Sequence, residues 1–128
     1  MPTAVTEGIR ITVQSAFEEA HSDLRAGRYL FSYRITISNT GRDTVQLLRR
    51  HWTIHDSLAP VREVEGPGVV GETPVIAPGT SYTYASACDL RSGLGRMEGS
   101  YLMRRTADDR RFRVRVPAFD LVHPVIDN

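Results

Sequence analysis

Large apolar residues recur at every second position along several stretches of this chain. The clearest stretch holds Tyr29, Phe31, Tyr33, Ile35 and Ile37, which alternate with a second, mostly polar set. Successive side chains of a β-strand point to opposite faces, so a period of two indicates a strand with one buried face. We therefore predict a half-buried strand here, ended by the turn residues Asn39-Thr-Gly41.

The same alternation predicts strands before and after this one. Ile9, Ile11 and Val13 mark an earlier strand, and a third strand is predicted from Thr44 to Ile54. On one face of the third strand we expect the side chains of Gln46, Leu48, Arg50, Trp52 and Ile54, with Trp52 at the centre of the core. Later strands are predicted at Ser81–Cys88, Arg96–Thr106 and Arg111–Val116.

These short strands, separated by turns and without a helical period of useful length, indicate an all-β fold. We predict an antiparallel β-sandwich of about seven to nine strands with no substantial helix. The 128 residues fit one domain, expected to span 1–128, and are enough to bury a core without disulfides.

The remaining composition narrows the cellular setting that we expect. Cys88 is the single cysteine, which excludes an intramolecular disulfide and suits a reducing compartment. No apolar run approaches the roughly 18 residues of a membrane span, and the N-terminus has no signal-peptide pattern. We therefore expect a cytoplasmic protein with no membrane partner.

The charges nearly cancel, with 16 basic and 15 acidic residues. Such a balance provides no overall field for nonspecific binding of nucleic acid, so we expect no nucleic-acid partner. Every one of the basic residues is arginine. Without lysine the chain has no Schiff-base chemistry, whereas arginine suits bidentate contacts with phosphate or carboxylate.

A Gly-x-Gly-x-x-Gly pattern lies in the segment Glu65–Gly79. In a dinucleotide fold this pattern introduces a helix, but Pro74 and Pro78 forbid one here. What the pattern allows is an anion nest of backbone N–H groups, although Pro67 removes one donor. The alternative is that the glycines only supply backbone angles that other residues resist. The residues of this candidate anion loop are Gly66, Gly68, Val69, Val70 and Gly71.

Arginines offer two further features that phosphate or carboxylate groups would contact. Arg49, Arg50 and Arg62, on strands near the glycines, are candidate partners for an anion held by the loop. Arg111, Arg113 and Arg115 would project about 6.6 Å apart from one face of a strand, close enough to engage an extended polyanion. The alternative for this arginine row is a solvated outer face that protects the sheet from aggregation.

The histidines, Ser86 and Cys88 do not have the geometry that zinc binding or catalysis requires. His51 and His55 have the spacing of a helical zinc site, but on a strand they are about 13 Å apart. His55 and Asp56 are neighbours and point to opposite faces, which spoils a catalytic dyad. Ser86 and Cys88 lie on an alternating strand without nucleophile context. We expect no enzyme activity, no cofactor and no metal site.

Several segments taken in order resemble the ApaG family. They are Tyr33-Arg-Ile-Thr-Ile-Ser-Asn-Thr-Gly41, Leu48-Arg-Arg-His-Trp52, Gly66-x-Gly-Val-Val-Gly-Glu72, Gly95-x-Met-x-Gly-Ser-Tyr101 and Val116-Pro-Ala-Phe119. The resemblance covers about residues 9–124. This chain departs from it by placing Pro67 inside the glycine loop and Asp108-Asp109 where a glycine turn is frequent.

The resemblance implies a fibronectin-type-III-like sandwich in a small bacterial cytoplasmic protein. It also implies association with cobalt and magnesium tolerance, without a mechanism. Two functions follow as hypotheses. The first is a protein-recognition module with an unidentified protein partner, or a homodimer formed through a sheet edge. The second is a domain that binds phosphate, pyrophosphate or a dinucleoside polyphosphate at the loop Gly66–Gly71.

Overall fold

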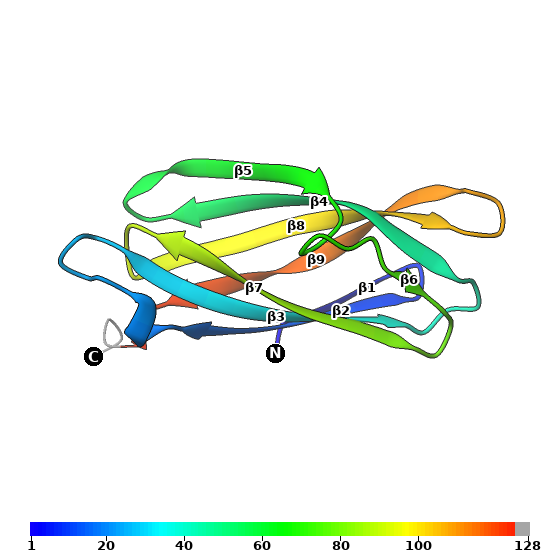
Figure 1. The fold of residues 1–128 in the computed structure, drawn as a ribbon, viewed down its shortest axis with the longest axis horizontal. Helices are drawn as coiled ribbons and strands as arrows, with labels where there is room; N and C mark the ends of the chain where they lie inside the picture. Colours follow the sequence, from blue (N-terminus) through cyan, green and yellow to red (C-terminus); the bar gives the residue numbers. More distant parts are fainter. Residues whose placement is uncertain (125–128) are drawn as a thin grey trace.

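The computed structural model describes residues 1–124 and consists of nine β-strands and one short 3-10 helix, η1 (Figure 1). The strands are β1 (Thr3–Thr6), β2 (Ile9–Phe17), β3 (Tyr29–Asn39), β4 (Val45–Asp56), β5 (Ala59–Pro67), β6 (Val75–Ile76), β7 (Ser81–Leu90), β8 (Leu94–Arg105) and β9 (Arg111–Val122), and η1 is Glu19–His21. In this part of the chain no helix is long and apolar enough to cross a membrane.

The strands form two antiparallel sheets, which confirms the predicted β-sandwich. One sheet has the order β1-β2-β3-β7, and the other has the order β5-β4-β8-β9 with β6 added beside β4. We call them the β3 sheet and the β4 sheet. Their inner faces meet in one core, so each sheet keeps one outer face for solvent or for a partner.

The alternation predicted for the first strands is confirmed by burial. Ile9, Ile11 and Val13 of β2 are buried, as are the inward residues of β3 from Phe31 to Ile37. Trp52 is 3% exposed and lies within 5.8 to 6.3 Å, between ring centroids, of Tyr33, Phe119 and Tyr101. Trp52 therefore occupies the core, as predicted.

The predicted inner face of β4 is wrong in its first half. Val45 and Leu47 are buried there, whereas Gln46 and Leu48 are only partly buried. The pairing of β4 with β8 shifts between Leu47 and Arg49, because a bulge adds one residue to β4. One extra residue exchanges the two faces of a strand, which returns Trp52 and Ile54 to the core.

Three strands escaped the sequence prediction: β1, β5 and β6. β5 was missed because eight of its nine residues are not buried, so its sequence carries little alternation.

At the end of β3 the predicted turn is present and is fixed by the buried Asn39. Its side chain donates to the carbonyls of Asp43 (2.8 Å) and Ile76 (3.0 Å) and accepts from the N–H of Gly41 (3.0 Å).

Candidate functional site

The glycine-rich loop runs along the edge of β4 between β5 and β6. The N–H of Gly68 donates to the carbonyl of Leu48 (2.8 Å), and the N–H of Leu47 donates to the carbonyl of Pro74 (3.0 Å). Between these anchors, Val69 and Glu72 exchange two backbone hydrogen bonds of 2.8 and 2.9 Å. The loop is thus a tight two-residue hairpin fastened to the β4 sheet.

Positive φ angles explain two of the three glycines. Gly68 has φ 60° and Gly71 has φ 77°, a region that suits glycine. A Cβ on Gly68 would also overlap the carbonyl of Glu72, so Gly68→Ala would distort the hairpin as well as any anion site. Val70, with φ 47°, occupies the same region although a β-branched residue disfavours it.

Most backbone N–H groups of the loop already donate hydrogen bonds within the protein. The N–H groups of Gly68, Val69 and Glu72 all donate to backbone carbonyls, and Val69 is buried. A nest needs consecutive N–H groups that point at an anion. Within the hairpin this leaves the amides of Val70 and Gly71, so anion binding by the loop stays a prediction with fewer donors than the sequence offered.

The three arginines predicted to assist the loop do not converge on it. Arg50 reaches it, but its guanidinium donates to the carbonyls of Pro67 (2.9 Å) and Gly68 (3.2 Å). Gly66 leaves room for this side chain, since a Cβ there would lie 3.2 Å from the Arg50 nitrogens. Arg49 lies on the other face of β4, and Arg62 contacts Asp89 at the far end of β5.

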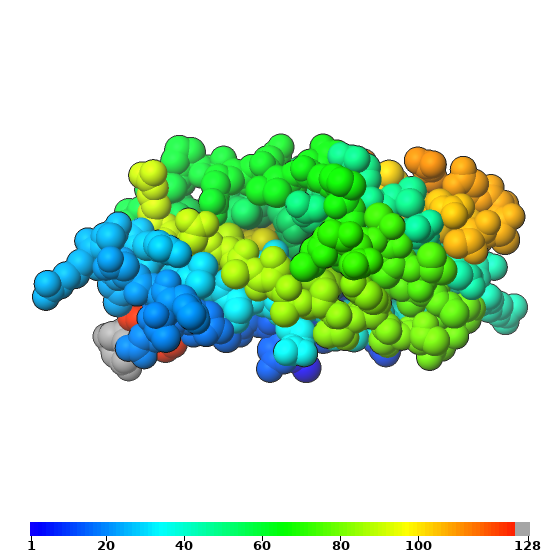
Figure 2. Space-filling model, in the orientation of Figure 1, coloured from blue at the N-terminus to red at the C-terminus, as the bar shows by residue number. Residues whose placement is uncertain are grey.

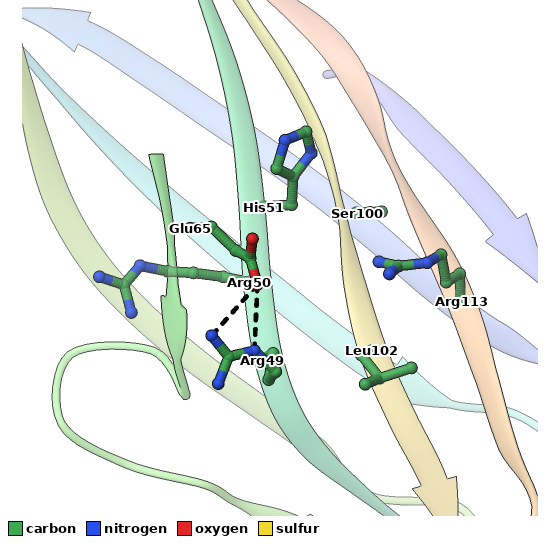
Figure 3. Close-up of a pocket in the computed structure, with 7 residues that line it drawn as sticks. All are labelled: Arg49, Arg50, His51, Glu65, Ser100, Leu102 and Arg113. Carbon is green, nitrogen blue, oxygen red and sulfur yellow. Dashed lines mark hydrogen bonds and ion pairs between the residues drawn. The ribbon is translucent and has the colours of Figure 1, made fainter. Parts of the chain in front are cut away.

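A second arginine-rich site lies on the outer face of the β4 sheet (Figure 3). It is a shallow hollow of about 450 Å³, which we call the arginine trough. Its lining residues come from all four long strands of the sheet and are Arg49, Arg50, His51, Glu65, Ser100, Leu102 and Arg113. These positions are far apart in the sequence, and the pairing of the strands brings them together.

Two cross-strand rows contribute residues to the trough, and Arg115 at the end of the second row is not among its lining residues. Leu102 pairs with Arg49 on one side and with Arg113 on the other. In the next row of the same face, Ser100 lies between His51 and Arg115. Neighbouring strands are about 4.8 Å apart, so the Cα atoms of Arg49 and Arg113 are separated by about 10 Å. The long side chains of Arg49 and Arg113 therefore lie on either side of the shorter side chains of Leu102 and Ser100.

Arg113 and Arg115 differ from most of the other arginines of this sheet, and Arg96 on β8 shares their lack of a partner in the described chain. Among residues 1–124, neither guanidinium has a carboxylate within ion-pair distance or a side-chain hydrogen bond. The predicted row of arginines is interrupted at Arg111, which lies 3.9 Å from Asp109. Arg115 is close enough to the Glu98 carboxyl to help lower its pKa, so Arg113 is the arginine of this row that is available to meet an anion.

Acidic residues at the β8–β9 turn neutralise the neighbouring arginines. Arg104 is 3.5 Å from Asp109, and Arg105 forms a bidentate pair with Asp108 at 2.6 and 2.9 Å. The hydrogen bond from Arg105 lowers the pKa of Asp108 to about 2. Asp108 and Asp109, which stand where a glycine turn is frequent in the family that the sequence resembles, thus offset positive charge at one end of the sheet.

The histidines of β4 contact glutamates. His51 Nε2 is 3.8 Å from Glu63, and His55 Nε2 is 3.0 Å from Glu98. The hydrogen bond with His55 lowers the pKa of the Glu98 carboxyl. In the described part of the chain no hydrogen bond joins His51 to Ser100, although the two are cross-strand neighbours, so this pair lacks the contact of a catalytic base with a nucleophile.

Cys88 is a residue of β7 and lines a cleft between β7 and β5. Burial raises the pKa of its thiol to about 11, an effect that outweighs the opposing influence of Arg62. A thiol with such a pKa is largely protonated at neutral pH and is a poor nucleophile. No group of three or more potential metal-ligating His, Cys, Asp or Glu side chains occurs within residues 1–124.

The trough was only partly visible in the sequence. The row Arg111, Arg113 and Arg115 drew attention to β9. On the opposite wall, Arg49 was connected instead with the glycine loop, and His51 was considered only as a zinc ligand with His55. Ser100 and Leu102 carried no signal as single residues. Only the register of four strands shows that these side chains share one hollow.

Comparison with known proteins gives a consistent result. The model of the ApaG domain family matches residues 19–105. Proteins named ApaG from Methylobacterium sp. (strain 4-46) and from Brucella suis biovar 1 are 47% and 45% identical over 124 residues, which is 97% of this chain and 95% of theirs.

Solved structures show the same similarity. The chain is 34% identical to a Bordetella pertussis protein named ApaA, with a TM-score of 0.86 over 96% of both chains. A structural-genomics target solved by X-ray crystallography gives a TM-score of 0.87 at 38% identity, over 96% of this chain and 92% of that one. An Archaeoglobus fulgidus protein at 8% identity has a TM-score of 0.53 and supports the fold alone.

Proposed function

This chain belongs to the ApaG family, and from that premise we propose that it is a non-enzymatic recognition domain whose arginine trough binds an acidic segment of a partner protein. The observation that carries the proposal is the guanidinium of Arg113, which has no carboxylate within ion-pair distance among residues 1–124 and lines the same hollow as Arg49 and His51. Arginine is suited to this task, because its planar fork binds carboxylate and phosphate with two parallel hydrogen bonds.

The shape of the trough favours an extended segment over a small buried ligand. The hollow is shallow, and its lining spans from Glu65 on β5 to Arg113 on β9. Small-molecule sites are usually concave and bury most of their ligand. An acidic chain lying across the strands would instead contact several arginines in succession, each of them partly hydrated.

The local charges support an anionic partner. Within the lining, Arg49 and Arg113 oppose a single carboxylate, Glu65. Glu65 is 3.1 Å from Arg49, and both side chains are about half exposed or more (60% and 47%). An exposed pair of this kind contributes little, so a partner carboxylate can replace Glu65 at small cost.

A titration of the isotope-labelled protein with acetylated hexaglutamate peptide tests this proposal. We expect saturable amide shifts at His51, Ser100, Leu102 and Arg113, weakened by added salt because exposed charges are screened. A hexalysine peptide is the control and should shift none of these amides. The proposal fails if hexaglutamate at millimolar concentration causes no shift there, or shifts both outer faces equally.

A further inference from the structure

The edge of β7 differs from the other sheet edges of this sandwich. β1 has only four residues, and β9 lies against it, since the N–H of Arg115 donates to Thr6 Oγ1 (3.3 Å). β5 carries Pro60 and Pro67 together with charged residues, which are devices that protect an edge from pairing. From Ser81 to Cys88, β7 has neither a proline nor a charge.

Three residues of β7 present unpaired backbone groups at this edge. The carbonyl of Asp89 accepts a hydrogen bond from Arg62 (2.6 Å), so it points away from β3. The N–H and C=O of one residue in an antiparallel ladder point to the same side, and the side alternates along the strand. The backbone groups of Thr83, Ala85 and Ala87 therefore also point outward, and within residues 1–124 no strand pairs with them.

A cleft lies beside this edge, between β7 and β5. It has a volume of about 290 Å³, with Ser86 and Cys88 on the β7 side and Arg62 and Val64 on the β5 side. Figure 2 shows β7 as a continuous lime band at the surface, with the green β5 segment above it. A strand added to β7 would direct every second side chain into this cleft.

The cleft has a defined chemical character. Its floor is apolar and includes Trp52 and Met97, and Val64 on its β5 side is 38% exposed. Arg50 also lines it, and this guanidinium contacts carbonyl groups without a carboxylate partner among the described residues. The cleft therefore fits one acidic and one apolar side chain, about 6.6 Å apart along an extended chain.

We propose that the β7 edge binds an extended segment of a partner protein by antiparallel strand addition, with an acidic and an apolar side chain in the cleft between β7 and β5. In such pairing the backbone hydrogen bonds provide affinity and the alternate side chains provide specificity. The outward positions of the segment meet Thr83, Ala85 and Ala87, whose small side chains accept almost any neighbour. This site shares Arg50 with the lining of the arginine trough but uses none of its other residues.

The probe is the acetylated hexapeptide Thr-Glu-Thr-Val-Thr-Thr, titrated into isotope-labelled protein. We expect saturable shifts at the amides of Thr83, Ala85 and Ala87. N-methylation of the first, third and fifth residues should abolish binding, because their N–H groups face β7 in an antiparallel pair. N-methylation of Glu and Val is the matched control and should leave the affinity within about threefold.

Two variants of the protein complete the test. Ala85→Pro removes one edge donor and should weaken peptide binding at least tenfold, while an edge position tolerates proline without loss of the fold. Ala85→Val keeps the donor and should retain binding. The proposal is overturned by absence of shifts at millimolar peptide, by equal loss with both methylation patterns, or by the same amides shifting with protein concentration alone, which would indicate pairing of two copies.

Discussion

The two outer faces of this sandwich present polar side chains to water in different ways. On the β3 sheet, four threonines form one row across the strands: Thr3, Thr12, Thr36 and Thr83. Their hydroxyls bond to one another, at 3.5 Å between Thr3 and Thr12 and 3.1 Å between Thr36 and Thr83. The hydroxyl groups of this row thus bond to one another in pairs, through short side chains.

The outer face of the β4 sheet keeps polar groups unsatisfied. Arg113 has no carboxylate within ion-pair distance in the described chain, and it lines a hollow instead of covering a flat surface. Arg10 and Arg34 on the outer face of the β3 sheet also have no carboxylate within ion-pair distance among residues 1–124, so the difference between the faces is the hollow beside the arginines of the β4 sheet. The comparison teaches that an exposed polar face becomes a candidate site when charged groups without partners also surround a hollow.

The largest expected effect comes from the strand beneath the trough. A Cβ on Gly99 would overlap the carbonyl of His51 and lie 2.9 Å from Trp52 Cε3. We expect Gly99→Ala to lower the free energy of unfolding by about 2–3 kcal/mol, measured by urea denaturation. Gly41→Ala is the control, with its nearest neighbour at 3.4 Å, and should cost less than about 1 kcal/mol. Similar losses for both variants would contradict this account of β8.

Charge reversal compares the two faces directly. Arg113→Glu places a negative charge in the trough and should weaken hexaglutamate binding at least tenfold, equivalent to about 1.4 kcal/mol. Arg34→Glu makes the same change on the outer face of the β3 sheet and should leave affinity within about twofold. Isothermal titration calorimetry measures both. Equal weakening would mean that overall charge governs binding and that the trough is not a site.

A smaller effect is expected where the hairpin of β4 and β5 meets the turn after β7. The Asp56 carboxylate accepts from the N–H groups of Leu58 (3.1 Å) and Arg91 (2.7 Å) and from Ser92 Oγ (2.8 Å). Burial raises the pKa of Asp56, but these hydrogen bonds outweigh it and hold the pKa below the ordinary value. Asp56→Asn should cost about 1 kcal/mol at pH 7.

The direction of the pH dependence follows from that lowered pKa. A carboxyl with a folded-state pKa below its unfolded value stabilises the protein above about pH 3.9, and this stability is lost as the pH falls further. Thermal melts between pH 7 and pH 3 should therefore show a shallower decline in the Asp56→Asn variant than in the native protein. Parallel declines would show that Asp56 titrates normally.

The smallest effect is expected on the threonine row. Thr36→Val removes the exposed hydrogen bond to Thr83 but keeps a β-branched side chain that favours strands. The free energy of unfolding should change by less than about 0.5 kcal/mol in urea, because surface substitutions away from special features have small effects. A loss above about 1 kcal/mol would show that this face is a cooperative structural element.

The alternation of apolar residues was sufficient to predict the sandwich. It failed in β4, because Leu47 and Leu48 are adjacent and a period of two cannot show which one faces inward across a bulge. The glycine pattern correctly predicted an unusual backbone, but the positive φ of Val70 carried no sequence signal. The trough could not be predicted, because it depends on the register of residues 49 to 113, which only the folded sheet determines.

The most direct test of the central claim follows the arginine side chains themselves. Titration with hexaglutamate, observed through the Nε–Hε resonances of the guanidiniums, compares Arg113 and Arg115 in the β4 sheet with Arg10 and Arg34 on the outer face of the β3 sheet. The account predicts saturable shifts for the first pair and none for the second. Equal shifts for all four, or none for Arg113 and Arg115, would contradict it.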